Sequence, residues 1–247
     1  MSVILTGKII FVACNTNLVG AGVVRSFLLE DATVIFPANS GKTITMLKAL
    51  MEDINTDKLV TLLTDYPDYD KAFDIVDAVM ERFGKIDIFI ICFDAPAAAK
   101  GLTETEITDW EKMIDRNITP FFVGARIVLS RMKAQGQGML VNIIGMNNSG
   151  NGTVLPLAGL SAAIQAEMTK VLYREVQRFN IRCHNLLVVN LTAADTGNIP
   201  GPGENKEMTP AGIAGYIMKL YSCEAGDSEN IFIWLPAKPG TGSINIQ

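Results

Sequence analysis

KIIFVACNTNLVGAGVVRSFLLE, residues 8–30, is the stretch on which the expected fold depends. It begins with a short apolar run rich in β-branched and aromatic side chains, Lys8 to Ala13. Three polar residues, 15–17, interrupt the run, and a helical pattern follows from about Gly20 to Glu30. Runs of this kind favour a strand, and the polar break favours a turn. The stretch therefore predicts a βα unit.

The rest of the chain repeats this alternation. Six more apolar runs predict strands at residues 33–36, 59–63, 86–92, 139–144, 183–189 and 231–235. Five helical patterns lie between them, at residues 43–51, 69–83, 106–133, 158–179 and 210–222. Continuous rather than alternating apolar runs are typical of parallel strands covered on both faces. We therefore expect an α/β fold: a single Rossmann-like doubly wound domain over residues 1–247, with a seven-stranded, mainly parallel sheet and helices on both faces.

Composition narrows the classes of function. With 247 residues, 49% of them hydrophobic, the chain can bury a sizeable core. Its net charge is −5, from 21 basic and 26 acidic residues, and no lysine or arginine cluster is dense enough to follow a phosphate backbone. Residues 1–7 lack the features of a signal peptide, and the apolar runs are too short to span a bilayer. We expect a cytoplasmic protein that binds neither nucleic acid nor membrane.

The cysteines and carboxylates do not suggest a metal site. Cys14, Cys92, Cys183 and Cys223 form no C-x-x-C pair, and three of them lie in strongly apolar stretches. This pattern is typical of reduced core thiols rather than disulfides or metal ligands. The aspartates at positions 65, 68, 70 and 74 do not follow the spacing of a calcium-binding EF-hand loop. We therefore expect no metal.

Three segments carry a resemblance to a known family. Leu5-Thr6-Gly7-Lys8-Ile9-Ile10 is similar to the opening strand of short-chain dehydrogenases/reductases. Gly84-Lys85-Ile86-Asp87-Ile88 is similar to their fourth strand, and Trp110 to Asn117 to their fourth helix. The chain resembles this superfamily over essentially its whole length. The resemblance implies a nicotinamide-dependent oxidoreductase framework, with a nucleotide at the first βα turn and a catalytic serine, tyrosine and lysine.

The family's catalytic positions hold different residues in this chain. Its tyrosine, the lysine four residues later and the serine about thirteen residues earlier fall on Ala158, Ala162 and Gly145. No tyrosine occurs between Tyr69 and Tyr173, and no Tyr-x-x-x-Lys exists anywhere. Methyl groups and a hydrogen cannot transfer protons. The family's asparagine in the fourth helix persists as Asn117, which we expect only to satisfy backbone at a helix irregularity. We expect no catalytic residues.

The nucleotide-binding positions also differ. Family members use three glycines so that backbone N–H groups approach the pyrophosphate, and the corresponding residues are Cys14, Leu18 and Gly20. After the second strand, Phe36-Pro37-Ala38-Asn39 offers neither an acid for the ribose 2′-hydroxyl nor an arginine for a 2′-phosphate. Asp65 matches an adenine-contacting aspartate of the family. We expect no cofactor on this chain and no cofactor-binding residues.

These losses predict a non-catalytic subunit, a pseudoenzyme that is no enzyme by itself. The expected partner is an active short-chain dehydrogenase homologue, in a heterodimer or heterotetramer, and NAD(P) is expected on that partner. The resemblance implies assembly through the long fourth and fifth helices, or through the C-terminal helix and strand. The pattern of loss is similar to that of inactive subunits in two-component dehydrogenases, including one that oxidises an aromatic hydroxyacyl-CoA in anaerobic toluene degradation.

Two alternatives stay open. The first is a cofactor-independent enzyme on the same fold, with Asp94, Asn117, Asn147 or Ser149 as its polar groups. Ser149 lacks an obvious base, because His184, the only histidine, lies in a strand-like stretch where a structural role is expected. The second alternative is a ligand-binding sensor whose pocket takes a metabolite without reaction.

Overall fold

The computed structural model describes residues 5–14, 18–64, 68–93, 100–146, 148–149, 153–154, 156–189, 208–222 and 231–235. Its main element is a seven-stranded sheet in which every pairing is parallel. The strands are β1 (Ile9–Cys14), β2 (Thr33–Ala38), β3 (Leu59–Leu63), β4 (Ile88–Cys92), β5 (Gly138–Met146), β8 (Ile181–Val189) and β9 (Phe232–Leu235). Their spatial order is β3-β2-β1-β4-β5-β8-β9. The expected doubly wound α/β fold is confirmed.

The helices lie between consecutive strands along the chain. They are α1 (Leu18–Leu29), α2 (Gly41–Ala49), α3 (Tyr69–Phe83), α4 (Ile107–Met113), α5 (Thr119–Gln135), α6 (Pro156–Val176) and α7 (Pro210–Ser222). Short 3₁₀ turns occur at Leu102–Glu104 and Gln177–Phe179. The single helix expected over residues 106–133 is interrupted by a π turn at Ile114–Ile118, between α4 and α5. A two-stranded antiparallel ribbon, β6 (Asn148–Ser149) and β7 (Thr153–Val154), was not expected.

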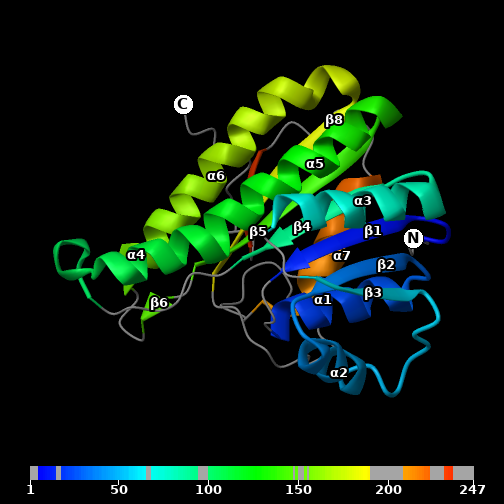
Figure 1. Cartoon of the computed structure of the whole chain (residues 1–247), viewed down its shortest axis with the longest axis horizontal. Coiled ribbons are helices and arrows are strands. Elements are labelled where there is room, and N and C mark those ends of the chain that lie inside the picture. Colours follow the sequence, from blue (N-terminus) through cyan, green and yellow to red (C-terminus); the bar gives the residue numbers. More distant parts are fainter. Residues whose placement is uncertain are drawn as a thin grey trace.

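The helices cover both faces of the sheet. Figure 1 shows α3, α5 and α6 on one side and α1, α2 and α7 on the other. Along β1 the side chains alternate, so that Ile10 and Val12 face α1 and α7, whereas Ile9 and Phe11 face α3 and α5. All four are buried. The continuous apolar runs of the sequence therefore have the origin expected for them, a sheet with a core on each face.

Local sequence explains several helix ends. The Ser40 hydroxyl accepts a hydrogen bond from the backbone N–H of Thr43 and caps α2. Asp68 caps α3 in the same way, accepting from the backbone N–H groups of Asp70 and Lys71. Gly84 ends α3 with a φ of 73°, a left-handed conformation that glycine adopts without steric cost. Ser40 and Asp68 thus set where α2 and α3 begin, and Gly84 sets where α3 ends and the chain returns to the sheet.

Candidate functional site

The candidate site lies at the carboxyl edge of the sheet, the edge formed by the C-terminal ends of its strands. The strand order reverses between β1 and β4, because the chain builds outward to β3 on one side and to β9 on the other. Open α/β sheets bind ligands outside the carboxyl ends of the strands at such a switch point. Cys14 ends β1 and Cys92 ends β4, and the two are directly paired across the strands. Both therefore lie at the switch point.

Three positions hold the catalytic residues of the family, and in this chain the structure brings them to one part of this edge. Gly145 lies near the end of β5, while Ala158 and Ala162 are one turn apart on α6, which packs against β5 and β8. Ala162 belongs to a small apolar cluster with Ile144 and Leu187. The surroundings of the lysine position are thus apolar. Of the three nucleotide-turn positions, Leu18 begins α1, but its side chain lies outside the described residues, as do residues 15–17.

Asn117 is fully buried in the π turn between α4 and α5. A π turn widens a helix locally and leaves backbone groups without the usual i−4 partners, and such turns are frequent at functional sites. The expected helix irregularity at Asn117 is therefore confirmed. The turn also packs against α6, the helix that carries Ala158 and Ala162.

Sequence reasoning missed two polar residues of the site, Ser161 and Gln165. The Gln165 side-chain amide donates to the backbone carbonyl of Phe93, just past β4, and to the Ser161 hydroxyl, both at 3.2 Å. Both side chains are buried, and the Gln165 carbonyl oxygen has no hydrogen-bond partner among the described residues. The available signal was a polar pair four residues apart within an apolar helix. This pair ties α6 to the end of β4.

A pocket of about 490 Å³ opens at the carboxyl ends of β2 and β3. Its lining residues are Asn39, Ser40, Gly41, Leu63, Thr64, Lys71, Asp74 and Ile75. The Thr64 hydroxyl is buried and has no hydrogen-bond partner among the described residues. Leu63, by contrast, exposes 66% of its surface. The pocket thus combines an unsatisfied hydroxyl with an exposed apolar side chain, which suits a ligand with both polar and planar apolar parts.

The remaining sequence candidates add little to this edge. Asp65, Asp94 and Asn147 lie outside the described residues, as does the side chain of Ser149. His184 is buried in the middle of β8, where alternation points it to the opposite face from Asn185, which contacts α6. Within the described ranges, no three histidine, cysteine, aspartate or glutamate side chains gather as a metal site would require. Nor is any described helix long and apolar enough to cross a membrane.

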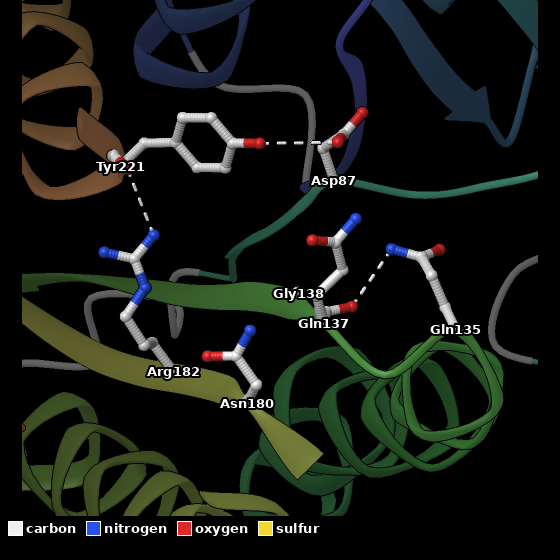
Figure 2. A pocket seen from close by; sticks show the side chains of 7 residues that line it. All are labelled: Asp87, Gln135, Gln137, Gly138, Asn180, Arg182 and Tyr221. Carbon is white, nitrogen blue, oxygen red and sulfur yellow. Dashed lines mark hydrogen bonds between the residues drawn. The ribbon is translucent and has the colours of Figure 1, made fainter. Parts of the chain in front are cut away.

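A second pocket, of about 280 Å³, lies at the opposite, amino edge of the sheet. Figure 2 shows its lining: Asp87, Gln135, Gln137, Gly138, Asn180, Arg182 and Tyr221. Asp87 is buried, accepts from the backbone N–H of Ile9 at 2.8 Å and pairs with Lys85 at 3.0 Å. The Arg182 guanidinium donates to the Leu220 and Tyr221 carbonyls at the end of α7.

These polar groups connect elements of the fold. The Tyr221 hydroxyl donates to Asp87 at 3.3 Å, so that α7 is joined to the start of β4. A hydrogen bond to Tyr221, and more weakly the charge of Asp87, raise the pKa of Lys8 above its ordinary value, although partial burial opposes the shift. The contacts are those of a network that holds strand starts and helix ends together.

Comparison with known proteins agrees with this architecture. The family model for short chain dehydrogenases matches residues 8–197, and the chain therefore belongs to that family. An uncharacterized oxidoreductase of Staphylococcus haemolyticus is 24% identical over 218 residues, which cover 87% of this chain and 90% of the relative. An uncharacterized oxidoreductase of Staphylococcus aureus strain USA300 is 21% identical over 215 residues, covering 87% and 91%.

Solved structures share the fold at low sequence identity. ElxO with NADP bound is 18% identical with a TM-score of 0.75, covering 92% of this chain and 96% of that one. A 3-ketoacyl-(acyl-carrier-protein) reductase from Brucella melitensis complexed with NADH is 16% identical with a TM-score of 0.76, covering 94% and 97%. Both superpose over nearly the whole length of this chain.

Two expectations are corrected by these findings. The expectation that the chain is no enzyme by itself is wrong, because its family is one of dehydrogenases and its curated relatives are named oxidoreductases. The expectation that the chain binds no cofactor is also wrong, since structures with the same fold hold NADP and NADH. Both expectations rested on matching single positions to a family pattern, and such matching does not exclude a different set of contacts on a shared framework.

Proposed function

We propose that this chain is a nicotinamide-nucleotide-binding oxidoreductase subunit, with the adenosine end of the nucleotide in the pocket at the ends of β2 and β3. The single observation that carries the proposal is the buried hydroxyl of Thr64, a residue that lines this pocket; the hydroxyl has no partner among the described residues. Buried polar groups are nearly always satisfied, so an orphan hydroxyl in a cavity favours a ligand or water that completes it. The NADP-bound and NADH-bound relatives of the same fold support the choice of ligand.

The rest of the pocket suits an adenosine. Exposed Leu63 and partly buried Ile75 offer apolar contact to the planar base. Asn39 and the N-terminus of α2, capped by Ser40, offer polar contact to ribose oxygens. No carboxylate stands at residues 36–39, and Lys71 and Asp74 on α3 supply one charge of each sign. We therefore expect both NADH and NADPH to bind, without strong discrimination.

A bound nicotinamide would supply or accept hydride. The chain's own described contribution near the switch point is positional: Gln165 holds the Phe93 carbonyl at the end of β4 and is itself held by Ser161. Both N–H groups of the Gln165 amide are used in these two hydrogen bonds, and neither side chain titrates near neutral pH. Any turnover by this chain therefore uses groups other than a tyrosine and lysine pair.

The test is a titration of the purified chain with NADH and with NADPH, followed by nucleotide fluorescence. We expect saturable binding within the range of about 1 μM to 1 mM that is usual for such ligands. Thr64→Val removes the hydroxyl at nearly constant shape and should weaken binding about fivefold, equivalent to roughly 1 kcal/mol for a lost hydrogen bond. Thr61→Val, in β3 three residues before Thr64 and outside the pocket lining, is the matched control and should bind as the wild type does.

Two results would overturn the proposal. One is the absence of saturable binding by either nucleotide at about 1 mM, the upper end of the usual range. The other is equal weakening by Thr64→Val and Thr61→Val, which would show a general effect on β3 instead of a contact at the pocket.

We further propose that the subunit assembles with an active, tyrosine-bearing short-chain dehydrogenase homologue. Supporting this, α4, α5 and α6 expose large apolar side chains: Ile107, Trp110, Phe122 and Val171. Exposed apolar side chains that gather on neighbouring helices often mark an interface.

As the first substrate for such a complex we propose an aromatic hydroxyacyl-CoA, 2-[hydroxy(phenyl)methyl]succinyl-CoA of anaerobic toluene degradation, because this chain's substitutions are similar to those in a subunit of the dehydrogenase that oxidises it. Turnover by a co-expressed complex tests that choice.

A further inference from the structure

Cys14 and Cys92 form a cross-strand pair at the switch point of the sheet. They are directly paired residues of the parallel strands β1 and β4. Neighbouring strands lie about 4.7–4.9 Å apart. That separation falls inside the range of about 4.4–6.8 Å found between the Cα atoms of disulfide-bonded cysteines. The two backbones are therefore already close enough for a disulfide.

Both side chains also point to the same face. Along β1, Ile10, Val12 and Cys14 contact the core under α1 and α7. Along β4, Ile88, Ile90 and Cys92 belong to that same core cluster. The intervening residues of both strands face the opposite core. Since side chains alternate along a strand, two thiols at paired positions on one face are neighbours.

The two thiols differ in access. Cys92 is buried, with 2% of its surface exposed, whereas Cys14, at the edge of the same cluster, is half-buried. A solvent oxidant therefore reaches Cys14 first, and Cys92 is the neighbour placed to react with the product. Redox-active cysteines are often arranged in this way, with an accessible thiol beside a resolving one.

We propose that Cys14 and Cys92 form a reversible disulfide when the chain meets a hydroperoxide. In the first step, the Cys14 thiol reacts with hydrogen peroxide, giving a sulfenic acid and one water. In the second, the Cys92 sulfur attacks the Cys14 sulfur, the S–S bond forms, and the hydroxyl leaves with the Cys92 proton as a second water. The two thiols lose two electrons and two protons, and the peroxide is reduced to water.

The geometry favours a labile disulfide. Paired residues of parallel strands hold their Cβ atoms at about the strand spacing of 4.7–4.9 Å, whereas a relaxed disulfide has Cβ atoms about 3.8 Å apart. Forming the bond must therefore draw the ends of β1 and β4 together, and strained disulfides are the easily reduced ones. Because the pair lies at the switch point, the bond would also weaken nucleotide binding, a consequence that rests on the proposed function.

The test uses the purified full-length chain. It is treated with hydrogen peroxide, blocked with N-ethylmaleimide under denaturing acid conditions and digested with trypsin without reduction. Tryptic residues 9–25 contain Cys14 as their single cysteine, and residues 86–100 contain only Cys92. We expect these two peptides to be lost and replaced by one cross-linked species, lighter than their sum by two hydrogen atoms. Dithiothreitol should restore both.

Matched variants sharpen the result. Cys92→Ser should abolish the cross-link and leave a sulfenic acid on Cys14 that dimedone traps, whereas Cys14→Ser should abolish both. Cys183→Ser, which alters a buried thiol in β8 on the other face of the sheet, should leave the cross-link unchanged. Oxidation of Cys14 to sulfinic acid without a cross-link in the wild type would overturn the proposal, and so would a cross-link between two chains.

The nucleotide titration is repeated on the oxidised chain. A cross-linked chain whose reduced form binds no nucleotide would overturn the proposed function and leave the disulfide standing. A chain that binds nucleotide but forms no cross-link would overturn the proposed disulfide and leave the proposed function standing.

Discussion

Cys183 lies in β8, buried in the apolar cluster on the face of the sheet that α3, α5 and α6 cover. Burial raises the pKa of its thiol to about 12, from an ordinary value of 9.0. The thiolate is the reactive form, and this rise in pKa leaves about a thousandfold less thiolate at pH 8 than an ordinary cysteine has. The environment of a cysteine, which composition does not reveal, thus decides its chemistry.

We predict that native Cys183 reacts with iodoacetamide at pH 8 about a thousandfold more slowly than a cysteine in an unfolded peptide. The measurement is the rate of mass gain on tryptic residues 183–206, which contain this single cysteine. The same chain in urea is the control, and there Cys183 should react at the rate of a cysteine in an unfolded peptide. Equal rates in the native and unfolded chain would contradict the prediction.

Asp31 has a φ of 64° in the turn before β2. Its carboxylate accepts hydrogen bonds from the Lys58 ammonium and, at 2.8 Å, from the Thr6 hydroxyl. These contacts, Lys58 first, hold its pKa below the ordinary value of 3.8. Because the folded pKa is lower than the unfolded one, the group contributes stability above pH 3.8, and that contribution is lost as the pH falls through the folded pKa.

Asp31→Asn should therefore lower the free energy of unfolding slightly at pH 7, and the difference from the wild type should shrink below pH 3.8. Asparagine tolerates positive φ, so the backbone is little disturbed. Urea unfolding at a series of pH values from 7 to about 3 measures the difference. Asp57→Asn, at an exposed turn position before β3, controls for a general charge effect. A difference that stays constant with pH would count against the role of the carboxylate.

At the scale of elements, α1 and α7 pack closely against each other at Gly22. A Cβ atom on Gly22 would overlap the ring of Pro210, the first residue of α7. Gly215, farther along α7, has open space around it and ordinary helical geometry. Both are helical glycines, yet only one is required by packing.

Gly22→Ala should lower the free energy of unfolding by about 1–3 kcal/mol, because the added methyl group forces α7 away from α1. Gly215→Ala should raise it by about 0.5–1 kcal/mol, since alanine favours a helix and no atom opposes the methyl group. Urea unfolding of the two variants measures both changes. If both substitutions changed the free energy of unfolding in the same direction, the contact between α1 and Pro210 would not explain the requirement for glycine at position 22.

At the scale of the whole molecule, α5 and α6 expose apolar side chains that a partner chain could cover. Phe122 exposes 52% of its surface on α5, and Val171 exposes 45% on α6. Both side chains are exposed among the residues that the structure describes, whereas the apolar residues on the inner faces of both helices are buried. A partner that covers them would remove apolar surface from water.

Val171→Glu should weaken the proposed assembly, with at least a tenfold loss of affinity for the partner, because a charge within an apolar interface is costly to desolvate. Size-exclusion chromatography with light scattering of the co-expressed chains measures it. Leu50→Glu, at an equally exposed apolar residue after α2, is the control and should leave the assembly intact. If Val171→Glu left the complex unchanged, the partner would have to bind elsewhere.

The sequence by itself determined the fold, since continuous apolar runs alternating with helical patterns specify a parallel sheet covered on both faces. The sequence also determined that the family's serine, tyrosine and lysine positions hold Gly145, Ala158 and Ala162 in this chain. Only the tertiary structure placed Cys14 beside Cys92 and joined Gln165 to Phe93. It also placed Thr64 in a pocket lining and left its hydroxyl without a partner in the described part of the chain. Periodicity records which face of an element is buried, which is a local property. Pairing between strands, the π turn at Asn117 and the satisfaction of buried polar groups depend on residues far apart in the chain, and no local pattern encodes them.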